Sequence, residues 1–197
     1  MVKAVLATKN RGKVEEMKAL LQGLGFEILS LDEVADVGEI VEDGNSFLEN
    51  AMKKAKVVAE KTGLLAIADD SGLEVDALDG RPGIHSARFA GENASDEENN
   101  IKLLHEMQDV PDEKRGAGFK CVIVAYRPDG KWLSVEGECR GIITTSQRGT
   151  NGFGYDPVFV PEGYDKTMAE LTSEEKNRIS HRGKALLRLK DEISRLL

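Results

Sequence analysis

Five consecutive apolar residues in the middle of the chain constrain its fold more than any other feature. The run Leu64–Ala68 has no polar alternation, so it predicts a central strand that is covered on both faces. Such a strand needs a layer of helices on each side, and helix-like segments alternate with strand-like ones along the chain. The sequence therefore predicts an α/β fold.

Apolar residues at helical spacing predict four helices around this strand. Two of them begin at capping-box sequences, Ser46–Glu49 and Ser95–Glu98. The predicted buried faces are Val14, Met17, Leu21 and Leu24 before a stop at Gly25; Phe47, Ala51, Ala55 and Val58 before Gly63; Ile101, Leu104 and Met107 or Gln108 before Pro111; and Leu186, Leu189, Ile193 and Leu196.

Two further strand signals decide the type of sheet. Lys3–Thr8 is a short apolar run suited to a buried first strand. Phe119–Tyr126 and Trp132–Val135 flank the turn sequence Arg127–Gly130, which predicts an antiparallel hairpin. The sheet is therefore expected to be mixed.

Length and charge limit the class of protein. A chain of 197 residues is the usual size of a single domain, here 1–197. The 27 basic and 35 acidic residues give a net charge of −8, which argues against nucleic-acid and membrane-surface partners. The first apolar run is too short for a signal peptide or a membrane span, so we expect a cytoplasmic protein. Cys121 and Cys139 are expected to be reduced packing residues.

The turn Thr8–Lys13 joins the first strand to the first helix. It places helix N–H groups and three cations where a phosphate could bind. It is not a P-loop, because Val14 stands where that motif needs a hydroxyl. The alternative is an ordinary turn with Asn10 as helix cap and solvated lysines.

Asp69 and Asp70 follow the central apolar run directly. We expect them at the carboxyl end of the strand, where ligand crevices of open α/β sheets form. They are stable there if they bind Mg²⁺ or if the turn Ser71–Gly72 satisfies them, and the alternative is that both only cap this turn. Neighbours on a strand point to opposite sides, so the two aspartates need not share a role. The acidic segment Glu39–Gly44 could complete a site for a hard cation.

Two later segments have the residue types of a nucleobase site. The loop Gly149–Pro157 surrounds Phe153 and Tyr155 with glycines, which suits stacking on a base or, alternatively, simple core packing. Basic residues also gather near a helix start at Ser180. Donors such as His181 and Arg182 would distinguish an oxo-purine from an amino-purine, although an ordinary surface helix has such residues too.

Six motifs in order make the sequence similar to the inosine triphosphate pyrophosphatase family, also described as XTP/dITP diphosphatases. The similarity spans nearly the whole chain. The motifs are Ala7–Lys13, Ser46–Ala51, Ala68–Leu73, Pro82–Arg88, Gly152–Pro157 and Ser180–Gly183.

The resemblance implies hydrolysis of ITP, dITP and XTP to the monophosphate and pyrophosphate with Mg²⁺, which would keep these nucleotides out of DNA and RNA. It also implies a long, twisted mixed sheet with flanking helices, two lobes around a central active-site cleft, and a homodimer. The alternatives are a pyrophosphatase that reads another base and a nucleotide sensor without turnover.

The resemblance also implies roles for residues by motif position. Asp70 is the expected general base and metal ligand, with Asp69 as its neighbour. Glu42 is the second expected metal ligand and Glu39 a weaker candidate, because Val41 stands where many relatives carry a glutamate. The expected substrate-binding residues are Thr8, Lys9, Asn10, Arg11, Gly12, Lys13 and Lys54 for the phosphates, Ser71 as a further contact, Phe153 for base stacking, Gly154, Tyr155 and Asp156 for the pocket wall, and Lys176, His181 and Arg182 for the base edge.

Overall fold

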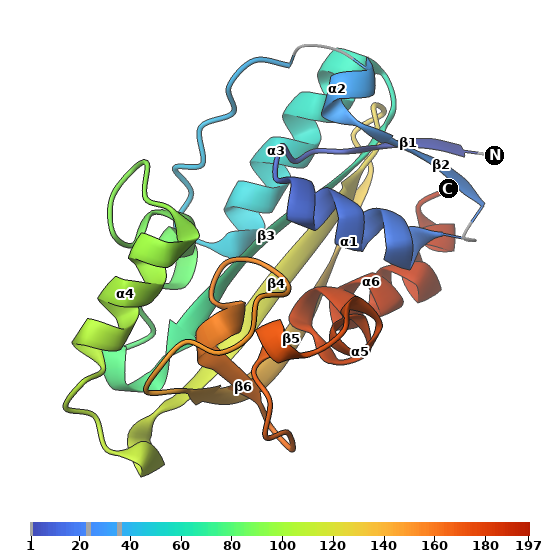
Figure 1. Ribbon diagram of the computed structural model, residues 1–197. Coiled ribbons are helices and arrows are strands. Elements are labelled where there is room, and N and C mark those ends of the chain that lie inside the picture. The colour runs from blue at the N-terminus through green and yellow to red at the C-terminus, as the bar shows by residue number, and fades with distance from the viewer. Residues whose placement is uncertain (1, 23–24, 35–36) are drawn as a thin grey trace. The chain divides into compact units, whose positions relative to one another are not determined.

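A mixed six-stranded sheet with flanking helices forms the fold (Figure 1). The computed structural model describes residues 2–22, 25–34 and 37–197. The strand order is β2-β1-β3-β4-β5-β6; β1 is parallel to β2 and β3, whereas β5 is antiparallel to β6. The predicted α/β fold with a mixed sheet is therefore confirmed. The strands are β1 (Val2–Leu6), β2 (Phe26–Ser30), β3 (Leu65–Val75), β4 (Gly116–Tyr126), β5 (Trp132–Ile143) and β6 (Phe159–Pro161).

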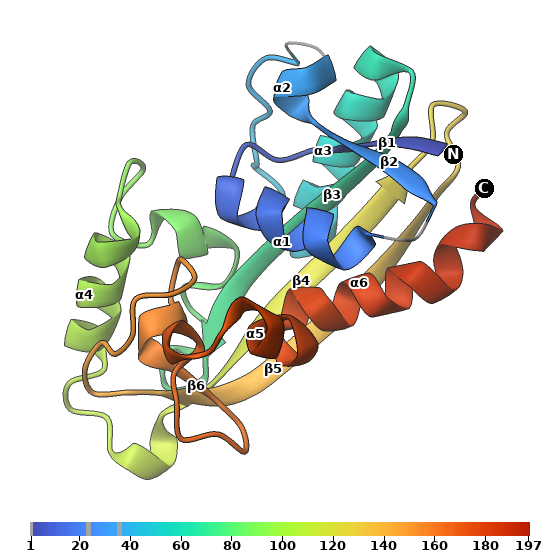
Figure 2. The same cartoon turned by 45° about the vertical axis from the view of Figure 1, so that its right-hand side comes forward.

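Among the residues that the structure describes, six α-helices accompany the sheet (Figure 2). They are α1 (Arg11–Leu21), α2 (Leu31–Val34), α3 (Phe47–Thr62), α4 (Asp96–Glu106), α5 (Ser173–Ile179) and α6 (His181–Glu192). Short 3₁₀ segments occupy Asp76–Leu78, Gly83–Arg88, Asp112–Lys114, Asp156–Val158, Met168–Glu170 and Ile193–Arg195. None of the helices in the described ranges is long and apolar enough to cross a membrane.

The chain divides into two compact units. Unit 1 consists of Met1–Asp70, Cys121–Gly137 and Arg182–Leu197, and unit 2 of Ser71–Lys120 and Glu138–His181. Cys121 belongs to unit 1 and Cys139 to unit 2, and both are buried thiols, as predicted.

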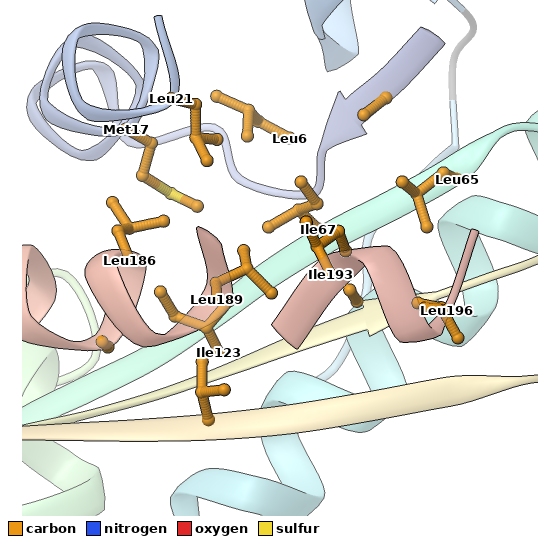
Figure 3. Close-up of a cluster of buried hydrophobic side chains, with 14 of the residues drawn as sticks. Leu6, Met17, Leu21, Leu65, Ile67, Ile123, Leu186, Leu189, Ile193 and Leu196 are labelled. Atoms are coloured by element: carbon orange, nitrogen blue, oxygen red, sulfur yellow. The ribbon is translucent and has the colours of Figure 1, made fainter. Parts of the chain in front are cut away.

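Strand β3 is covered on both faces within unit 1, as the apolar run predicts. Leu65 and Ile67 belong to one core with α1 and α6, and Ala66 and Ala68 to another core with α3. Figure 3 shows the first core, in which α1 contributes Met17 and Leu21 and α6 contributes Leu186 and Leu189. Because side chains point alternately to the two faces of a strand, successive residues of β3 pack against different helices.

The predicted helices form, with differences at their ends. Helix α1 ends at Leu21, before the expected stop at Gly25, and the predicted core residue Leu24 lies outside the described residues. At α3, Ser46 caps the helix, but the Glu49 carboxylate accepts from the N–H of Asn45 instead of completing the predicted capping box. The 3₁₀ segment Ile193–Arg195 carries Ile193, which was expected on the last helix itself.

The buried face of helix α4 matches the prediction in part. Its Ser95 capping box is present, Met107 is buried and Leu104 is partly buried, as predicted. The prediction was wrong for Ile101, which is 56% exposed, whereas Leu103, Asn99 and Asn100 are buried. The two asparagines were not predicted in the core because they are polar, and they are stable there because they hydrogen-bond within unit 2.

Several strand ends also differ from prediction. Strand β1 ends at Leu6, although the Ala7 N–H still bonds to Ile67 O at 2.8 Å. The predicted hairpin is present around Arg127–Gly130, where the Arg127 N–H bonds to Lys131 O at 2.8 Å. Its strands β4 and β5 run longer than their apolar runs because Gly116–Gly118 and Glu136–Ile143 continue the strands without an apolar signal.

Candidate active site

Strand β3 carries two buried aspartates in its interior. The sequence predicts that Asp69 and Asp70 lie at the carboxyl end of the strand, with Ser71–Gly72 available for a tight turn after them. This is wrong, because β3 continues through these residues to Val75. Asp69 is fully buried and Asp70 nearly so. Buried carboxylates require charged or hydrogen-bonding partners, and these partners define the site.

The two aspartates point to different faces of β3. Asp69 follows the alternation of Leu65 and Ile67, which face α1 and α6, whereas Asp70 follows Ala66 and Ala68, which face α3. The partners of each carboxylate that are described below come from those same helices. The expectation that the two carboxylates point to opposite sides of the strand is confirmed.

Asp69 lies in a buried ion-pair cluster. Its Oδ2 is 3.1 Å from Lys13 Nζ and 3.0 Å from Arg182 Nη2, and Arg182 also pairs with Glu16 of α1. Burial alone would raise the pKa of Asp69, but the charges of Lys13 and Arg182 outweigh it and hold that pKa well below the usual range. Asp69 is therefore ionised at neutral pH and holds two cations.

Asp70 has a weaker set of partners on the other face. Its Oδ2 accepts a hydrogen bond from Asn50 Nδ2 at 3.0 Å, and its Oδ1 is 3.8 Å from Lys54 Nζ. Burial raises the pKa of Asp70, and the nearby Lys54 charge only partly opposes this shift. A carboxylate with a raised pKa is a better proton acceptor, which is the property that a general base needs.

Lys54 joins Asp70 to the acidic segment before α3. Its ammonium donates to Glu42 Oε2 at 2.9 Å. Burial would lower the pKa of Lys54, but the surrounding charges of Asp69, Asp70 and Glu42 raise it. Lys54 is a buried cation on the same helix face as Ala51, Ala55 and Val58.

The segment that carries Glu42 is attached to α3 by several contacts. The Gly44 N–H donates to Asn50 Oδ1 at 2.8 Å, and the Asn45 N–H donates to Glu49 Oε2 at 2.7 Å. Asp43 and Lys53 form an exposed ion pair at 2.5 Å. These bonds keep Glu42 beside Lys54, whereas Glu39 is exposed.

The phosphate-binding candidates at the start of α1 form a capped turn. Asn10 is the N-cap, with Oδ1 accepting from the Lys13 N–H at 3.1 Å, and Thr8 Oγ1 accepts from the Asn10 N–H at 3.2 Å. The capping interpretation of Asn10 is thus confirmed. Lys9 Nζ lies 3.4 Å from Gly38 O.

Helix α1 has no acidic residue in its first turn, so no side chain of that turn neutralises the partial positive charge at the N-terminal end of the helix. Arg11 is exposed and Gly12 half-buried there. A capped turn with this charge remains compatible with phosphate binding.

The fit of a divalent cation can be judged from Glu42 and Asp70. One oxygen of each faces the same Lys54 ammonium, so both carboxylates converge on one positive centre. Over residues 2–22, 25–34 and 37–197, no group of three or more His, Cys, Asp or Glu side chains is arranged to hold a metal. Proteins nevertheless usually bind Mg²⁺ through only one or two carboxylates, and phosphate oxygens and water supply its other ligands. The residues present therefore fit such an ion in the presence of a polyphosphate.

Unit 2 holds the aromatic loop around Phe153. The Asp156 carboxylate accepts from Lys176 Nζ at 2.5 Å and from the Phe153 N–H at 3.0 Å. The Lys176 ammonium lies over the half-buried Phe153 ring, 4.6 Å from its centroid. A Cβ on Gly152 would stand 2.1 Å from Asp156 Oδ2, so this tight turn requires glycine.

Helix α4 holds the next residue of this loop by its backbone. The Gly154 N–H donates to Asp96 Oδ2 at 2.7 Å, and Gly154 O accepts from Asn100 Nδ2 at 2.9 Å. Tyr155 packs in the core of unit 2 and donates to Ser86 O at 2.7 Å. The core-packing interpretation is thus confirmed for Tyr155, while Phe153 is only half-buried.

The remaining candidates lie around the short helix α5 and the start of α6. Lys176 is on α5, a helix that the sequence pattern did not predict separately. His181 is buried in unit 2, where its ring stacks on Phe119 with centroids 4.8 Å apart. Arg182 belongs to unit 1 and binds Asp69 and Glu16, so its predicted contact with a base edge stays a prediction. Ser71 follows Asp70 on β3 and is half-buried.

The candidates thus fall into one group in each unit, and sequence reasoning missed some members of both groups. In unit 1 the missed residues are Asn50 and Glu16; in unit 2 they are Asp96 and Asn100. Asn50 had a detectable signal, because it stands four residues before Lys54 and so on the same helix face. Glu16 had no signal, since its partner is at the far end of the chain.

This fold and these groups define an α/β protein whose buried lysines and carboxylates suit a polyphosphate ligand. The Ham1 family model matches residues 4–192, and the chain belongs to the Ham1 family. A relative from Geobacter sulfurreducens, named dITP/XTP pyrophosphatase, is 55% identical over 98% of this chain and 97% of its own length. A relative of the same name from Desulforamulus reducens is 51% identical over 99% of this chain and 97% of its own length.

Solved structures are also similar to this chain over nearly its whole length. A HAM1 protein from Coxiella burnetii matches with a TM-score of 0.89 and 42% identity, covering 99% of this chain and 100% of that one. A nucleoside-triphosphatase, also titled dITP/XTP pyrophosphatase, from Mycobacterium abscessus matches with a TM-score of 0.77 and 45% identity, covering 95% and 98%.

Proposed function

We propose that this protein is a nucleoside triphosphate pyrophosphatase that hydrolyses dITP, ITP and XTP to the monophosphate and pyrophosphate. Relatives that share about half of its residues over their full lengths carry the name dITP/XTP pyrophosphatase. The structural observation that supports this most directly is the arrangement of the Glu42 and Asp70 carboxylates around the buried Lys54 ammonium. Removal of these non-standard purine nucleotides keeps them out of DNA and RNA.

Asp70 is the proposed general base. Its carboxylate takes the proton of a water molecule as the water oxygen forms a bond to the α-phosphorus. The bond between that phosphorus and the oxygen bridging to the β-phosphorus breaks, and pyrophosphate leaves with the bonding electrons. The raised pKa of Asp70, which results from its burial, suits this role.

The cations of unit 1 are the proposed triphosphate ligands. Lys13 and Lys54 are held by carboxylates in this structure, and phosphate oxygens would compete for the same ammonium groups. Thr8 and Asn10 shape the turn at the positive end of α1, with Lys9, Arg11 and Gly12 beside them. Fixed charges of this kind stabilise the charge that develops on the leaving pyrophosphate.

Glu42 and Asp70 are the proposed ligands of Mg²⁺. Their convergence on Lys54 supports this assignment. When bound, Mg²⁺ would supply charge neutralisation to the phosphates. The exposed Glu39 is a poorer candidate.

The residues around Phe153 are the proposed base site. Phe153 would stack on the purine, with Gly154, Tyr155 and Asp156 forming the wall and Ser71 a further contact. Lys176, His181 and Arg182 are the proposed donors to the six-position carbonyl. Donors arranged for a carbonyl are left unpaired against the amino group of adenine, which disfavours adenine nucleotides by about 1–3 kcal/mol for each buried unsatisfied group.

Pyrophosphate release from dITP, XTP, dGTP and dATP tests the function, with Mg²⁺ and with a chelator. The expected result is metal-dependent monophosphate from dITP and XTP and little from dATP and dGTP. Nucleoside diphosphate as product would contradict the proposed bond cleavage. Preference for another base would support the alternative specificity, and binding without turnover would support the sensor.

Two further expectations from the family resemblance are part of the proposal. We propose a homodimer, which light scattering coupled to size-exclusion chromatography tests. We also propose a cytoplasmic enzyme, which fractionation of the source cells tests. The net charge of −8 argues against a nucleic-acid partner.

A further inference from the structure

Asn50 contacts both segments that carry the proposed metal ligands. It is 1% exposed and lies on α3, four residues before Lys54. Its amide bonds to the Asp70 carboxylate on one side and to the Gly44 N–H, two residues after Glu42, on the other. We propose that Asn50 is a positioning residue. It holds the Asp70 carboxylate and the segment of Glu42 at the relative positions that a divalent cation requires. This inference rests on the proposed function of the site.

The two bonds require the two ends of an amide. Asp70 Oδ2 needs a donor, which Asn50 Nδ2 provides at 3.0 Å, and the Gly44 N–H needs an acceptor, which Asn50 Oδ1 provides at 2.8 Å. Aspartate in place of Asn50 would keep the acceptor and lose the donor. A hydrophobic side chain would lose both.

The bond to Asp70 orients that carboxylate. With Oδ2 held by Asn50, Oδ1 is the oxygen that faces Lys54 Nζ, at 3.8 Å. The same ammonium donates to Glu42 Oε2. Asn50 therefore selects which oxygen of Asp70 is directed toward the centre that Glu42 also faces.

The bond to the Gly44 N–H holds the segment that carries the second carboxylate, that of Glu42. A Cβ on Gly44 would be 2.7 Å from Asn50 Oδ1 and 2.8 Å from the Glu49 Cβ, so the Glu42 segment passes α3 more closely than a side chain permits. This close approach leaves the segment little freedom to shift along the helix. Residues behind metal ligands that orient them in this way change metal affinity or activity by about 10–100-fold when replaced.

Asn99 on α4 offers a matched control. It is also a buried helical asparagine with two bonds of the same kind: its Oδ1 accepts from the Ala90 N–H at 2.8 Å, and its Nδ2 donates to Ala87 O at 3.1 Å. Its donor bonds to a backbone carbonyl and not to a carboxylate. Replacement of Asn99 therefore measures the structural cost of losing such a residue.

The test uses Asn50→Ala, Asn50→Asp, Asn99→Ala and Asn99→Asp in the full chain. Mn²⁺ binding to each protein without nucleotide is measured by electron paramagnetic resonance, and kcat and KM are measured for dITP. We expect Asn50→Ala to raise the Mn²⁺ dissociation constant about 10–100-fold, and both Asn50 variants to lower kcat by about the same factor with a smaller change in KM. The Asn99 variants should lower the melting temperature without these effects.

Two results would overturn the inference. The first is wild-type kcat in Asn50→Asp, because the bond to Gly44 would then suffice. The second is wild-type Mn²⁺ affinity in Asn50→Ala. If Asn50→Ala fails to fold, the nearly isosteric Asn50→Asp decides by its kcat.

The same measurements separate this inference from the proposed function. A wild-type protein that releases no pyrophosphate would contradict the proposed function. The Mn²⁺ affinities of Asn50→Ala and Asn99→Ala would still decide whether Asn50 positions a cation site.

Discussion

Asp69 and Asp70 are consecutive residues of one strand, yet their carboxylates face different helices and their pKa values shift in opposite directions. Asp69 lies between Lys13 and Arg182, and Asp70 lies against Asn50 and Lys54. Despite burial, the neighbouring charges lower the pKa of Asp69, while burial raises the pKa of Asp70. This separation agrees with the proposed roles, in which Asp69 holds cations and Asp70 accepts a proton.

Asp70→Asn should abolish most turnover while the fold is retained. Loss of a general base lowers kcat by roughly 10²–10⁴-fold. Because the folded-state pKa of Asp70 is raised, its charged form weakens the fold as pH rises through that pKa, and asparagine removes this effect. Pyrophosphate release and urea unfolding at neutral pH check both parts. Near-normal turnover in the folded variant would remove Asp70 from the role of base.

Asp69→Asn should instead destabilise the protein. It removes the anion that the half-buried Lys13 and the buried Arg182 share, while Arg182 keeps its pair with Glu16, and breaking a buried ion pair from one side costs about 3–5 kcal/mol. Urea unfolding at pH 7 measures this loss. A loss below that of Asp70→Asn would contradict the assignment of Asp69 to the structural cluster.

The stability difference between wild type and Asp69→Asn should also depend on pH. The folded-state pKa of Asp69 is depressed, so its contribution is complete above the unfolded-state pKa of about 3.9 and declines as pH falls toward the folded value. The two proteins should therefore approach each other in stability as acid is added below about pH 4. A difference that stays constant down to pH 2 would show that the Asp69 pKa is not depressed relative to the unfolded chain, or that its charge does not stabilise the fold.

Local patterns predict much of this fold, because apolar spacing and capping residues act within a few positions of each other. They find α1, α3, α4 and the hairpin. They miss the continuation of β3 through Asp69–Gly72, because the partners that make buried aspartates stable there are distant. Arg182 pairs with Asp69 from 113 residues away, and no local rule reports such a contact.

The candidate site, like the fold, could be predicted only in part from the sequence. Lys54 and Glu42 could be proposed from motif position, and the structure shows that they pair. Asn50 lies within the Ser46–Ala51 motif but was assigned no role, because the function of an uncharged residue is recognised only from its hydrogen-bond partners. The family motif likewise gave Arg182 a base-reading role that says nothing of its buried bonds to Asp69 and Glu16.

Arg182 can be tested with a double-mutant cycle. Arg182→Met and Asp69→Asn should each destabilise the protein, and the double variant should lose less than both losses added, with a coupling of about 0.5–3 kcal/mol. Denaturant unfolding of the four proteins gives this number. Strict additivity would mean that the 3.0 Å contact carries no coupling energy.

The same Arg182→Met variant tests base choice. The family resemblance predicts that the preference for dITP over dATP falls when Arg182 is replaced. The ratio of kcat/KM for the two nucleotides checks this in protein that is folded at the assay temperature. An unchanged ratio would restrict Arg182 to the buried cluster with Asp69 and Glu16.

Phe153→Ala should weaken binding of the base. Stacking of a base on an aromatic side chain contributes about 1–3 kcal/mol, so KM for dITP should rise roughly 5–150-fold, with a smaller change in kcat. The loop itself should stay in place because Asp156 still accepts from Lys176, and α4 still holds both backbone groups of Gly154. Steady-state kinetics with dITP and XTP measure the effect.

The control for this prediction is a second phenylalanine with the same kind of partner. The Lys102 ammonium lies 4.5 Å from the centroid of the Phe89 ring, which matches the 4.6 Å between Lys176 and Phe153. Phe89→Ala therefore removes an equivalent contact between a cation and a ring, along with its packing, outside the proposed base site. A similar rise of KM in both variants would attribute the effect to general loosening of unit 2. A rise confined to Phe153→Ala would assign the energy to the stacked base, because the contact with lysine is lost in both.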